Sequence, residues 1–480
     1  MGNPPEEDKR LYPRVKTNLK VGISKTTATA SNDFSEGGLS LSSEETISSP
    51  TVSLRIGFPD KQFEFKVNAK LIWKRNLEKG GSLYGLEFIK LTENQKTELR
   101  RELVRIQIQG LLNGIKIPEI KTQVADFFLN DVLNYINEII KVNLCLSNQT
   151  KYSESLERKL EYLHTRILLK GYCLEELIFD KTKIKRIKDN FRQLTGAWIY
   201  KSKIVQRAFE KPRGYPGDYK LLEIIYDNKP ISKNIGIYFD NNFLKNPYAA
   251  AVRIRKDRLK KLLQQYIGGI NSNHINILNI ACGSCREIQE LLPDLKTKSL
   301  VTFACLDWDE EALKFSQNKL LSLHTGNLVL QDGDERGDRG KFPSFRIKGA
   351  GNKTKNIEVQ FIKEDVMSII KNNSLLKSLG KQNLIYSIGL IDYLPDRVLK
   401  KLIYVLYHLL ESGGRLILTH KNREKTFPPV FPDWFCDWRF VPRDREEILE
   451  LFYDCGISGF SVPWESDDFA YTYYFTITKN

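Results

Sequence analysis

Residues 275–287 constrain the fold of this chain more than any other stretch. The apolar run Ile275-Asn276-Ile277-Leu278-Asn279-Ile280 leads directly into Ala281-Cys282-Gly283-Ser284-Cys285-Arg286-Glu287. An apolar run that ends in small residues predicts a buried strand, a tight loop and a helix whose first N–H groups approach a ligand. A second apolar run, Leu300–Leu306, ends at Asp307. An acid at this place is well positioned to bind both hydroxyls of a ribose.

Further apolar runs follow at the spacing of alternating strands and helices. Val359–Ile362 ends at Lys363-Glu364-Asp365, Leu384–Leu390 leads into Ile391-Asp392-Tyr393-Leu394, and Arg415–His420 follows the pair Gly413-Gly414. Strands that alternate with helices predict a doubly wound, Rossmann-like α/β sheet, which we place at residues 266–480. In such folds the acid after the third strand contacts an adenine, and we expect Asp365 in that place.

The N-terminal part has a different pattern, with short strand-like runs separated by Gly, Pro, Asp and Ser. The runs are Leu19–Ile23, Val52–Ile56, Phe63–Val67, Ala69–Trp73 and Leu83–Phe88. This spacing predicts a small antiparallel β-barrel over residues 8–108. It ends in a helix for which Thr92 is the expected N-cap.

Between these parts, residues 115–265 show helical periodicity, for example Leu156, Leu160, Leu163 and Ile167. The period is interrupted at Lys211-Pro212-Arg213-Gly214-Tyr215-Pro216-Gly217-Asp218-Tyr219. Two prolines and two glycines in this segment exclude a helix interior and predict a shaped loop. From its chemistry alone the loop is either the lining of a ligand pocket or a connector whose aromatic rings pack on the core.

Charge and composition narrow the class of protein. The formal net charge is +15, and residues 151–261 hold 26 Lys and Arg against 13 Asp and Glu, so the excess lies in the middle. A basic middle region binds an acidic partner or simply forms solvated helix faces. No nucleic-acid-reading motif is present, so nucleic acid is not expected. Seven cysteines, no membrane-spanning run and no signal-peptide pattern favour a cytoplasmic protein with free thiols.

Two motifs in the barrel region carry a resemblance to a known family. Lys9-Arg10-Leu11-Tyr12-Pro13-Arg14 has an RxxxR spacing, and Asp33-Phe34-Ser35-Glu36-Gly37-Gly38 has the pattern DxSxxG. Together they resemble the two cyclic-di-GMP-binding motifs of PilZ domains. The resemblance implies that Arg10, Arg14, Asp33, Ser35 and Gly38 bind cyclic-di-GMP. The chemistry agrees, because paired arginines bind phosphates and guanine edges through bidentate hydrogen bonds.

The order of strands after residue 266 resembles the class I methyltransferase fold, in which S-adenosylmethionine lies over the strand ends. One departure is clear: the usual acid-x-Gly-x-Gly-x-Gly loop reads Asn279-x-Ala281-x-Gly283-x-Cys285. This loop, the segment 211–219, residues 387–394 and residues 433–439 resemble the family of 3-hydroxypalmitic acid methyl ester biosynthesis proteins. The resemblance implies a set of cofactor-binding residues: Asn279, Ala281, Cys282, Gly283, Asp307, Trp308, Asp365, Val366, Ser387 and Gly389.

The resemblance also implies a reaction, the transfer of a methyl group to a small acidic or lipid-like acceptor such as a 3-hydroxy fatty acid carboxylate. The residues expected around the sulfonium and the acceptor are Tyr215, Asp218, Asp392, Tyr393 and His420. His420 is the expected base if the acceptor is a hydroxyl. A metal at Cys282-x-x-Cys285 is not expected, because no second pair of ligands accompanies it.

Three hypotheses for the whole chain stay open. It is a cyclic-di-GMP-responsive methyltransferase that acts on a small molecule, a methyltransferase that acts on an acidic protein partner or its acyl group, or a cyclic-di-GMP-dependent binding module without catalysis.

Overall fold

The computed structural model describes residues 14–23, 27–58, 64–78, 80–147, 152–295, 297–323, 328–329, 345–347, 357–371, 378–426, 430–457 and 462–480. The chain divides into two compact units. The first comprises Met1–Gln206 with Ser232–Phe239, and the second comprises Arg207–Ile231 with Asp240–Asn480. The loop 211–219 therefore belongs to the same unit as the C-terminal sheet.

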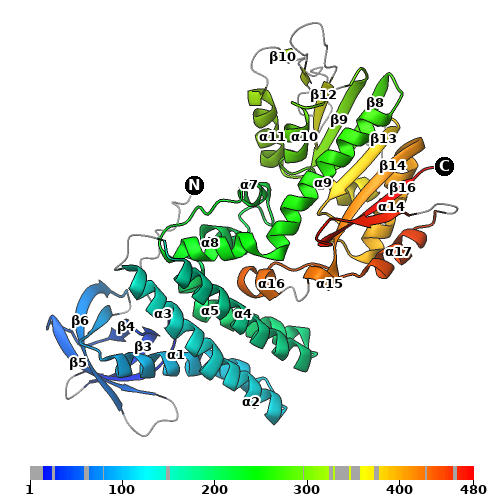
Figure 1. Cartoon of the computed structure of the whole chain (residues 1–480). Helices are drawn as coiled ribbons and strands as arrows, with labels where there is room; N and C mark the ends of the chain where they lie inside the picture. The colour runs from blue at the N-terminus through cyan, green and yellow to red at the C-terminus, as the bar shows by residue number, and fades with distance from the viewer. Residues whose placement is uncertain are drawn as a thin grey trace. The chain divides into compact units, whose positions relative to one another are not determined.

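The first unit begins with an antiparallel barrel (Figure 1). Its strands are β1 (Val15–Lys16), β2 (Lys20–Ile23), β3 (Thr27–Ser35), β4 (Gly38–Ser43), β5 (Thr51–Gly57), β6 (Glu64–Asn76) and β7 (Ser82–Ile89). Their order is β1-β3-β2-β5-β6-β7-β4, and pairing of β3 with β4 closes a ring of six strands to which β1 is added. Alternate residues of β5 and of the first half of β6 are buried, as expected of strands with one face on a core. The predicted barrel is confirmed.

Helix α1 (Glu93–Asn113) follows the barrel and covers its core with Leu99 and Leu103. Thr92 caps it in a capping box with Gln95, so the predicted N-cap is confirmed. A buried ion pair joins the same helix to the DxSxxG hairpin. Arg100 donates to both carboxylate oxygens of Glu36, through Nε and, at 2.6 Å, through Nη2, and its Nη1 donates to Asn137 Oδ1 at 2.9 Å.

The predicted helical middle region is also confirmed. Its elements are α2 (Pro118–Asp126), the π-helical turn η1 (Phe127–Val132), α3 (Leu133–Ser147), α4 (Glu154–Leu177), α5 (Lys181–Ile199), α6 (Lys203–Glu210), α7 (Tyr219–Asp227), α8 (Ile235–Lys245) and α9 (Pro247–Gly269). Among the described residues no helix is both long and apolar enough to cross a membrane.

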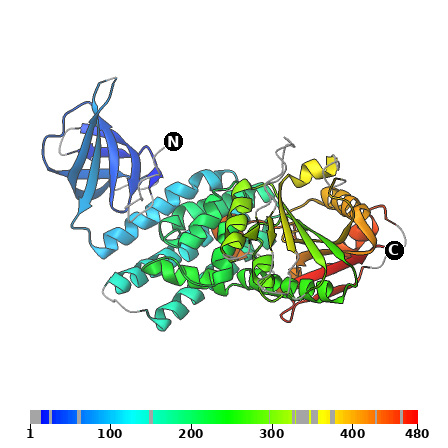
Figure 2. The same cartoon turned by 90° about the horizontal axis from the view of Figure 1, so that it is seen from above.

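The second unit is built on a single sheet, seen with its helices in Figure 2. Its strands are β8 (His274–Ile280), β9 (Leu300–Asp307), β10 (Leu328–Val329), β11 (Phe345–Ile347), β12 (Ile357–Lys363), β13 (Gln382–Ile388), β14 (Leu410–Lys421), β15 (Trp464–Ser466) and β16 (Thr472–Thr478). The order is β10-β11-β12-β9-β8-β13-β14-β16-β15, with β12, β9, β8, β13 and β14 mutually parallel. The predicted doubly wound α/β fold is confirmed.

Helices cover both faces of this sheet. One face packs on α9, α10 (Arg286–Leu291) and α11 (Glu310–Leu323). The other packs on α12 (Val366–Lys371), α14 (Asp396–Leu409) and α17 (Arg445–Tyr453), while the short helices α15 (Arg423–Thr426) and α16 (Val430–Cys436) follow β14. The chain reverses its winding at β8, between β9 and β13. Ligands of such sheets bind beyond the carboxyl ends of the strands at this point.

Candidate functional site

The first candidate site lies on the barrel, where two predicted ligand residues already contact each other. Arg14 Nη1 donates to Asp33 Oδ1 at 2.6 Å, and both side chains are partly exposed. The same Asp33 oxygen accepts from Ser40 N at 3.1 Å, which fixes the carboxylate at the base of the β3–β4 hairpin. The two side chains thus form an exposed, ion-paired edge. Arg10 lies outside the described residues.

Ser35 and Gly38 have a different environment from these two residues. Ser35 is buried, and its hydroxyl donates to Gly38 O at 3.0 Å across the hairpin turn. A Cβ at Gly38 would lie 2.1 Å from Leu86 O, so only glycine fits against β7. The absence of a side chain at Gly38 therefore has a structural reason within the barrel. The ligand roles of Ser35 and Gly38 stay predictions.

The second candidate site lies at the carboxyl ends of the parallel strands, beginning with the loop after β8. Ala281, Gly283 and Cys285 have φ angles of 55°, 54° and 51°. The departure from the Gly-x-Gly-x-Gly pattern therefore preserves the left-handed turns, at a cost of about 1 kcal/mol or more for each non-glycine residue. Strain of this kind is typical of functional loops.

Beneath this loop Asn279 is buried at the end of β8. Its Nδ2 donates to Glu287 Oε1 at 2.9 Å, while its Oδ1 has no hydrogen-bond partner among the described residues. The same Glu287 oxygen accepts from Tyr386 Oη at 2.9 Å. Burial raises the pKa of Glu287 to about 8. Asn279 therefore presents a buried acceptor at the strand end.

Asp307 connects the loop to the end of β9. Its Oδ2 accepts from Gly283 N at 2.8 Å and its Oδ1 accepts from Asp309 N at 2.9 Å. Burial raises the pKa of this carboxyl to about 6, against backbone hydrogen bonds that favour the ionised form. The predicted pair of Gly283 and Asp307 thus meets at one point of the strand edge.

The loop 211–219 lies on the same edge. Arg213 donates to both oxygens of Asp309, at 2.9 Å and 2.5 Å, and Tyr215 Oη donates to Asp309 Oδ2 at 3.3 Å. The Tyr215 ring lies 5.3 Å from the ring of Trp308, which is half-exposed. Burial and neighbouring carboxylates raise the pKa of Tyr215, so its hydroxyl keeps its proton. Tyr215 is therefore a hydrogen-bonding and packing group at the predicted cofactor edge.

Asp218 lies at the end of this loop, and both of its carboxylate oxygens accept hydrogen bonds. It accepts from Leu221 N at 2.9 Å as the N-cap of α7, and from Arg207 Nε and Nη2 at 3.0 Å and 2.8 Å. These contacts hold the loop on the helix that follows it. The catalytic role of Asp218 stays a prediction.

The other predicted cofactor residues lie at or just beyond the ends of β12 and β13. Asp365 is exposed and accepts from Met367 N at 3.1 Å at the start of α12, and Val366 is buried behind it. Ser387 is buried and donates to Ile280 O at 2.7 Å, which ties β13 to β8. Gly389 has a φ of 84°, and a Cβ there would lie 2.7 Å from Arg255 Nη2. These residues complete the edge that β12, β9, β8 and β13 form.

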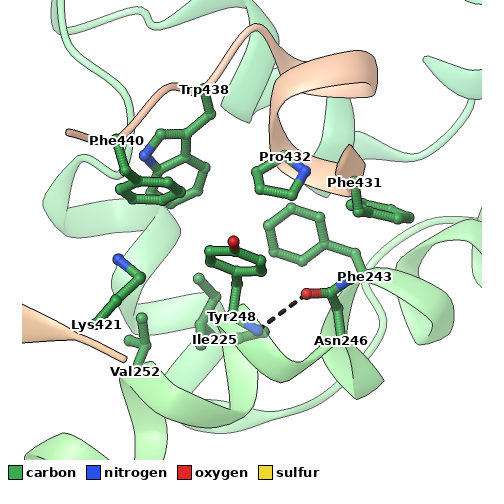
Figure 3. Close-up of a pocket in the computed structure, with 11 residues that line it drawn as sticks. Ile225, Phe243, Asn246, Tyr248, Val252, Lys421, Phe431, Pro432, Trp438 and Phe440 are labelled. Atoms are coloured by element: carbon green, nitrogen blue, oxygen red, sulfur yellow. Dashed lines mark hydrogen bonds between the residues drawn. The ribbon is translucent and has the colours of Figure 1, made fainter. Parts of the chain in front are cut away.

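An aromatic pocket lies in the same unit (Figure 3). Its lining comes from α7, α8, the N-cap and first turns of α9, the last residue of β14 and the segment after β14: Ile225, Phe243, Asn246, Tyr248, Ala249, Val252, Lys421, Phe431, Pro432, Trp438 and Phe440. The rings of Tyr248 and Phe440 stack with centroids 5.3 Å apart, and Trp438 lies 5.7 Å from Phe440. Such a lining suits an apolar or flat group.

The loop 211–219 also reaches this pocket. A Cβ at Gly217, whose φ is 72°, would lie 2.6 Å from the Trp438 ring. Lys211 Nζ donates to Asp437 O at 2.8 Å, and Trp438 Nε1 donates to Tyr393 Oη at 2.8 Å. One loop therefore contacts the predicted cofactor edge through Arg213 and the aromatic pocket through Gly217.

Asp392 is buried beside the pocket in a cluster of cationic groups. It accepts from Lys421 N at 2.9 Å and from Lys421 Nζ at 3.2 Å, and Arg255 Nη1 lies 3.6 Å away. Although burial acts to raise it, these cations hold the pKa of Asp392 well below its usual range. Asp392 is therefore a permanent carboxylate that positions cations.

His420 is also buried next to Asp392, but it does not line the pocket. Neighbouring residues of a strand point to opposite faces, so Lys421 enters the pocket and His420 does not. The His420 Nε2–Asp392 Oδ1 distance is 3.8 Å, and burial lowers the pKa of His420. Its role as a base stays a prediction.

The loop after β8 contains two of the buried cysteines of this unit. Cys282, Cys285 and Cys305 are buried free thiols. In the described part of the chain no three His, Cys, Asp or Glu side chains are grouped to hold a metal ion.

Two family models match the chain. Residues 8–105 match the PilZ domain, and residues 214–323 match a family described as "putative methyltransferase". The second match begins in the loop 211–219 and runs through the strained loop, Asp307 and α11. The chain is therefore similar to the PilZ domain over its barrel and to this methyltransferase family between the loop 211–219 and the end of α11. No curated protein matches it.

Several solved structures are similar to parts of the chain. A possible exported protein from Bordetella parapertussis is 13% identical over 73% of this chain and 95% of that one, with a TM-score of 0.38. The inhibitor of motility from Bacillus subtilis is 22% identical over 22% and 56%, with a TM-score of 0.20. Magnesium protoporphyrin IX methyltransferase from Synechocystis PCC 6803 is 15% identical over 48% and 87%, with a TM-score of 0.32. With TM-scores below 0.5, these similarities assign neither fold nor activity to the chain.

The second unit also contains candidate site residues that the sequence pattern did not identify. Asp309 binds the loop arginine, Arg255 lies against Gly389 and Asp392, and Lys421 enters the pocket with Tyr248 and Phe440. The only sequence feature that indicated Asp309 was its position, two residues after the acid Asp307 at the end of a strand. Nothing in the local sequence relates Tyr248 to Phe440.

Proposed function

We propose that the second unit is an S-adenosylmethionine-dependent methyltransferase and that the PilZ domain makes its activity responsive to cyclic-di-GMP. The acceptor is a small acidic or lipid-like molecule, such as the carboxylate of a 3-hydroxy fatty acid. The observation that carries the proposal is that one loop, 211–219, contacts both the strand edge with Asp307 and the aromatic pocket. We also keep the domain boundaries 8–108, 115–265 and 266–480 as a proposal.

The residues of the strand edge suit the proposed methyl donor. S-adenosylmethionine supplies a methyl group on a positively charged sulfur. Asp307 offers two carboxylate oxygens to a ribose diol, and Asn279 Oδ1 is a buried acceptor in need of a donor. Asp365 and Val366 lie at the next strand end, where an adenine is expected. Gly389, directly after β13, has no side chain, and its φ of 84° favours glycine there.

The aromatic pocket suits an acceptor with an apolar part. A carboxylate acceptor is ionised at neutral pH and needs no general base, so the methyltransferase domain has mainly to orient it and exclude water. Trp438 links this pocket to Tyr393 and to the loop 211–219. The loop 211–219, which contacts both the strand edge and the pocket, would hold donor and acceptor together.

On the PilZ domain, Arg14 and Asp33 provide the exposed edge for cyclic-di-GMP, together with the predicted Arg10, Ser35 and Gly38. A guanidinium that is already paired with a carboxylate is oriented for a bidentate contact with a phosphate or a guanine. The ion pair between Glu36 and Arg100 joins this hairpin to α1 and α3 within the first unit. That pair gives a bound nucleotide a physical route to the helices.

The proposal is tested by incubating the full chain with S-adenosylmethionine and a panel of acceptors. The panel contains a 3-hydroxy fatty acid, the corresponding alcohol and an acyl chain carried by an acidic protein. Mass spectrometry should detect a methyl ester of the free acid, in an amount that depends on cyclic-di-GMP. Methylation of the protein-bound chain alone would favour a protein partner. Binding of cyclic-di-GMP without binding of the methyl donor would favour an effector without catalysis.

A further inference from the structure

The aromatic pocket has a charged feature that the proposed function does not explain. Among the described residues that line it, Lys421 alone carries a charge, because Asn246 is neutral and caps α9 through Tyr248 N at 2.9 Å. Figure 3 shows the lysine entering from the end of β14 beside the Phe440 ring. Its Nζ lies 3.8 Å from the centroid of that ring. A single ammonium in an apolar pocket is costly unless it has a partner.

Asp392 is only a partial partner for this ammonium. The carboxylate is shared between Lys421 Nζ at 3.2 Å and Arg255 Nη1 at 3.6 Å, and His420 beside it is kept neutral by burial. Two cations thus face one buried carboxylate, which leaves one positive charge in excess. The side chains of Lys421 and Arg255 are 8% and 6% exposed, so water and salt screen this charge poorly. An anion in the pocket would balance it.

The position of this charge relates the pocket to the strand edge. Lys421 ends β14, and Asp392 follows β13, the strand that contains Ser387 and leads into Gly389. Arg255 reaches from Asp392 to the Gly389 backbone, where a Cβ would lie 2.7 Å from its Nη2. An anionic group bound to Lys421 therefore lies on the side of the pocket next to the end of β13.

We propose that Lys421 is a positioning and specificity residue, which holds the anionic head group of an amphipathic acceptor while the aromatic walls hold its apolar part. The inference rests on the proposed function and adds the residue that selects the acceptor. A neutral alcohol of the same chain length would contact the apolar walls but would carry no negative charge for Lys421 to bind. Conversion of a carboxylate into a neutral methyl ester removes the charge that Lys421 binds, so the product is held more weakly than the acceptor.

The experiment measures binding without the methyl donor, so that it is independent of catalysis. Calorimetry compares dodecanoate with methyl dodecanoate on the full chain. The wild type should bind the carboxylate on the order of tenfold to a hundredfold more tightly, the usual effect of a hydrogen bond to a charged group. Lys421→Met should abolish this preference and Lys421→Arg should retain it. Lys425→Met, at an exposed lysine of α15, is the matched control and should bind like the wild type.

A measurement on the wild type alone covers the case in which Lys421→Met does not fold. Burial and Arg255 lower the pKa of Lys421 to about 8 against the attraction of Asp392. A lysine binds an anion only when protonated, so the preference for dodecanoate should decline as the pH rises from 7 to 10. Arg255 stays charged in this range, and Asp392 and neutral His420 do not titrate in it. Tyr248, whose ring centroid lies 5.9 Å from Lys421 Nζ, also faces the ammonium, so the same decline in Tyr248→Phe assigns it to Lys421.

The outcomes separate this inference from the proposed function. Equal binding of acid and ester by the wild type, or a carboxylate preference that survives Lys421→Met, overturns the inference even if methyl transfer is observed. A preference that depends on Lys421 without any methyl transfer supports the inference and contradicts the proposed reaction.

Discussion

Lowering the pH from 8 to 5 should weaken the binding of S-adenosylhomocysteine, because Asp307 becomes protonated. Burial raises the pKa of this carboxyl to about 6, and only its ionised form offers both oxygens to a ribose diol. With that pKa, roughly one molecule in eleven is ionised at pH 5 and nearly all are ionised at pH 8. The dissociation constant should therefore rise about tenfold between these pH values.

Ionisation of Asp307 should favour ligand binding but disfavour folding. An acid whose pKa is raised in the folded protein favours folding while it is protonated, and this contribution is lost as the pH rises through about 6. The cofactor-free methyltransferase domain should therefore be destabilised by Asp307 at neutral pH, and a bound diol should offset that cost. Ionised Asp307 is thus expected to lower the stability of the ligand-free protein and to strengthen the binding of a diol.

Calorimetric titration of the full chain at pH 5, 6, 7 and 8 measures the effect. Asp307→Asn is the control, which should bind weakly with a flat pH profile. Glu287, with a pKa of about 8, lies beneath the loop, and any pH dependence left in the Asn variant would come from this second acid. The reasoning is refuted if the wild-type dissociation constant changes less than twofold between pH 5 and 8, or if the Asn variant keeps the same profile.

Three further variants test other parts of the account. Arg14→Ala should weaken cyclic-di-GMP binding at least about tenfold in calorimetry, and an unchanged affinity would contradict the assigned edge. Glu36→Ala leaves Arg100 buried without its carboxylate and should lower the free energy of unfolding by about 3 kcal/mol; a loss below about 1 kcal/mol in urea titration would show that the pair is dispensable. Gly389→Ala should lower both the melting temperature and the affinity for S-adenosylhomocysteine, because its Cβ meets Arg255 and φ is 84°; wild-type values of both would count against the tight contact.

The sequence was sufficient to predict the two folds because the apolar residues of each fold recur at a characteristic local spacing. Alternate burial in β5 and β6 and apolar runs ending in Gly283 or Asp307 depend on local spacing, and the structure retains that spacing. The backbone conformation of the loop after β8 could not be predicted from its sequence motif. Ala281 and Cys285 replace the expected glycines and still adopt positive φ, which a pattern of residue types does not predict.

The acceptor side was less predictable for physical reasons. Choosing between His420 and Lys421 requires knowledge of which face of β14 meets α9, and that depends on tertiary packing rather than on the strand itself. The stacked pair of Tyr248 and Phe440 joins residues far apart in the sequence. Asp218, by contrast, has the local pattern of a helix N-cap, and a capping rule would have identified that role.

Transfer of a labelled methyl group from S-adenosylmethionine to 3-hydroxypalmitate tests the central claim most directly. The assay follows label into the organic-extractable fraction with and without cyclic-di-GMP, using the wild type, Arg14→Ala and Asp307→Ala. The account predicts a labelled methyl ester whose rate depends on the nucleotide in the wild type, loses that dependence in Arg14→Ala, and is absent in Asp307→Ala. Label that appears equally in all three proteins, or in none of them although the wild type binds the methyl donor, would contradict it.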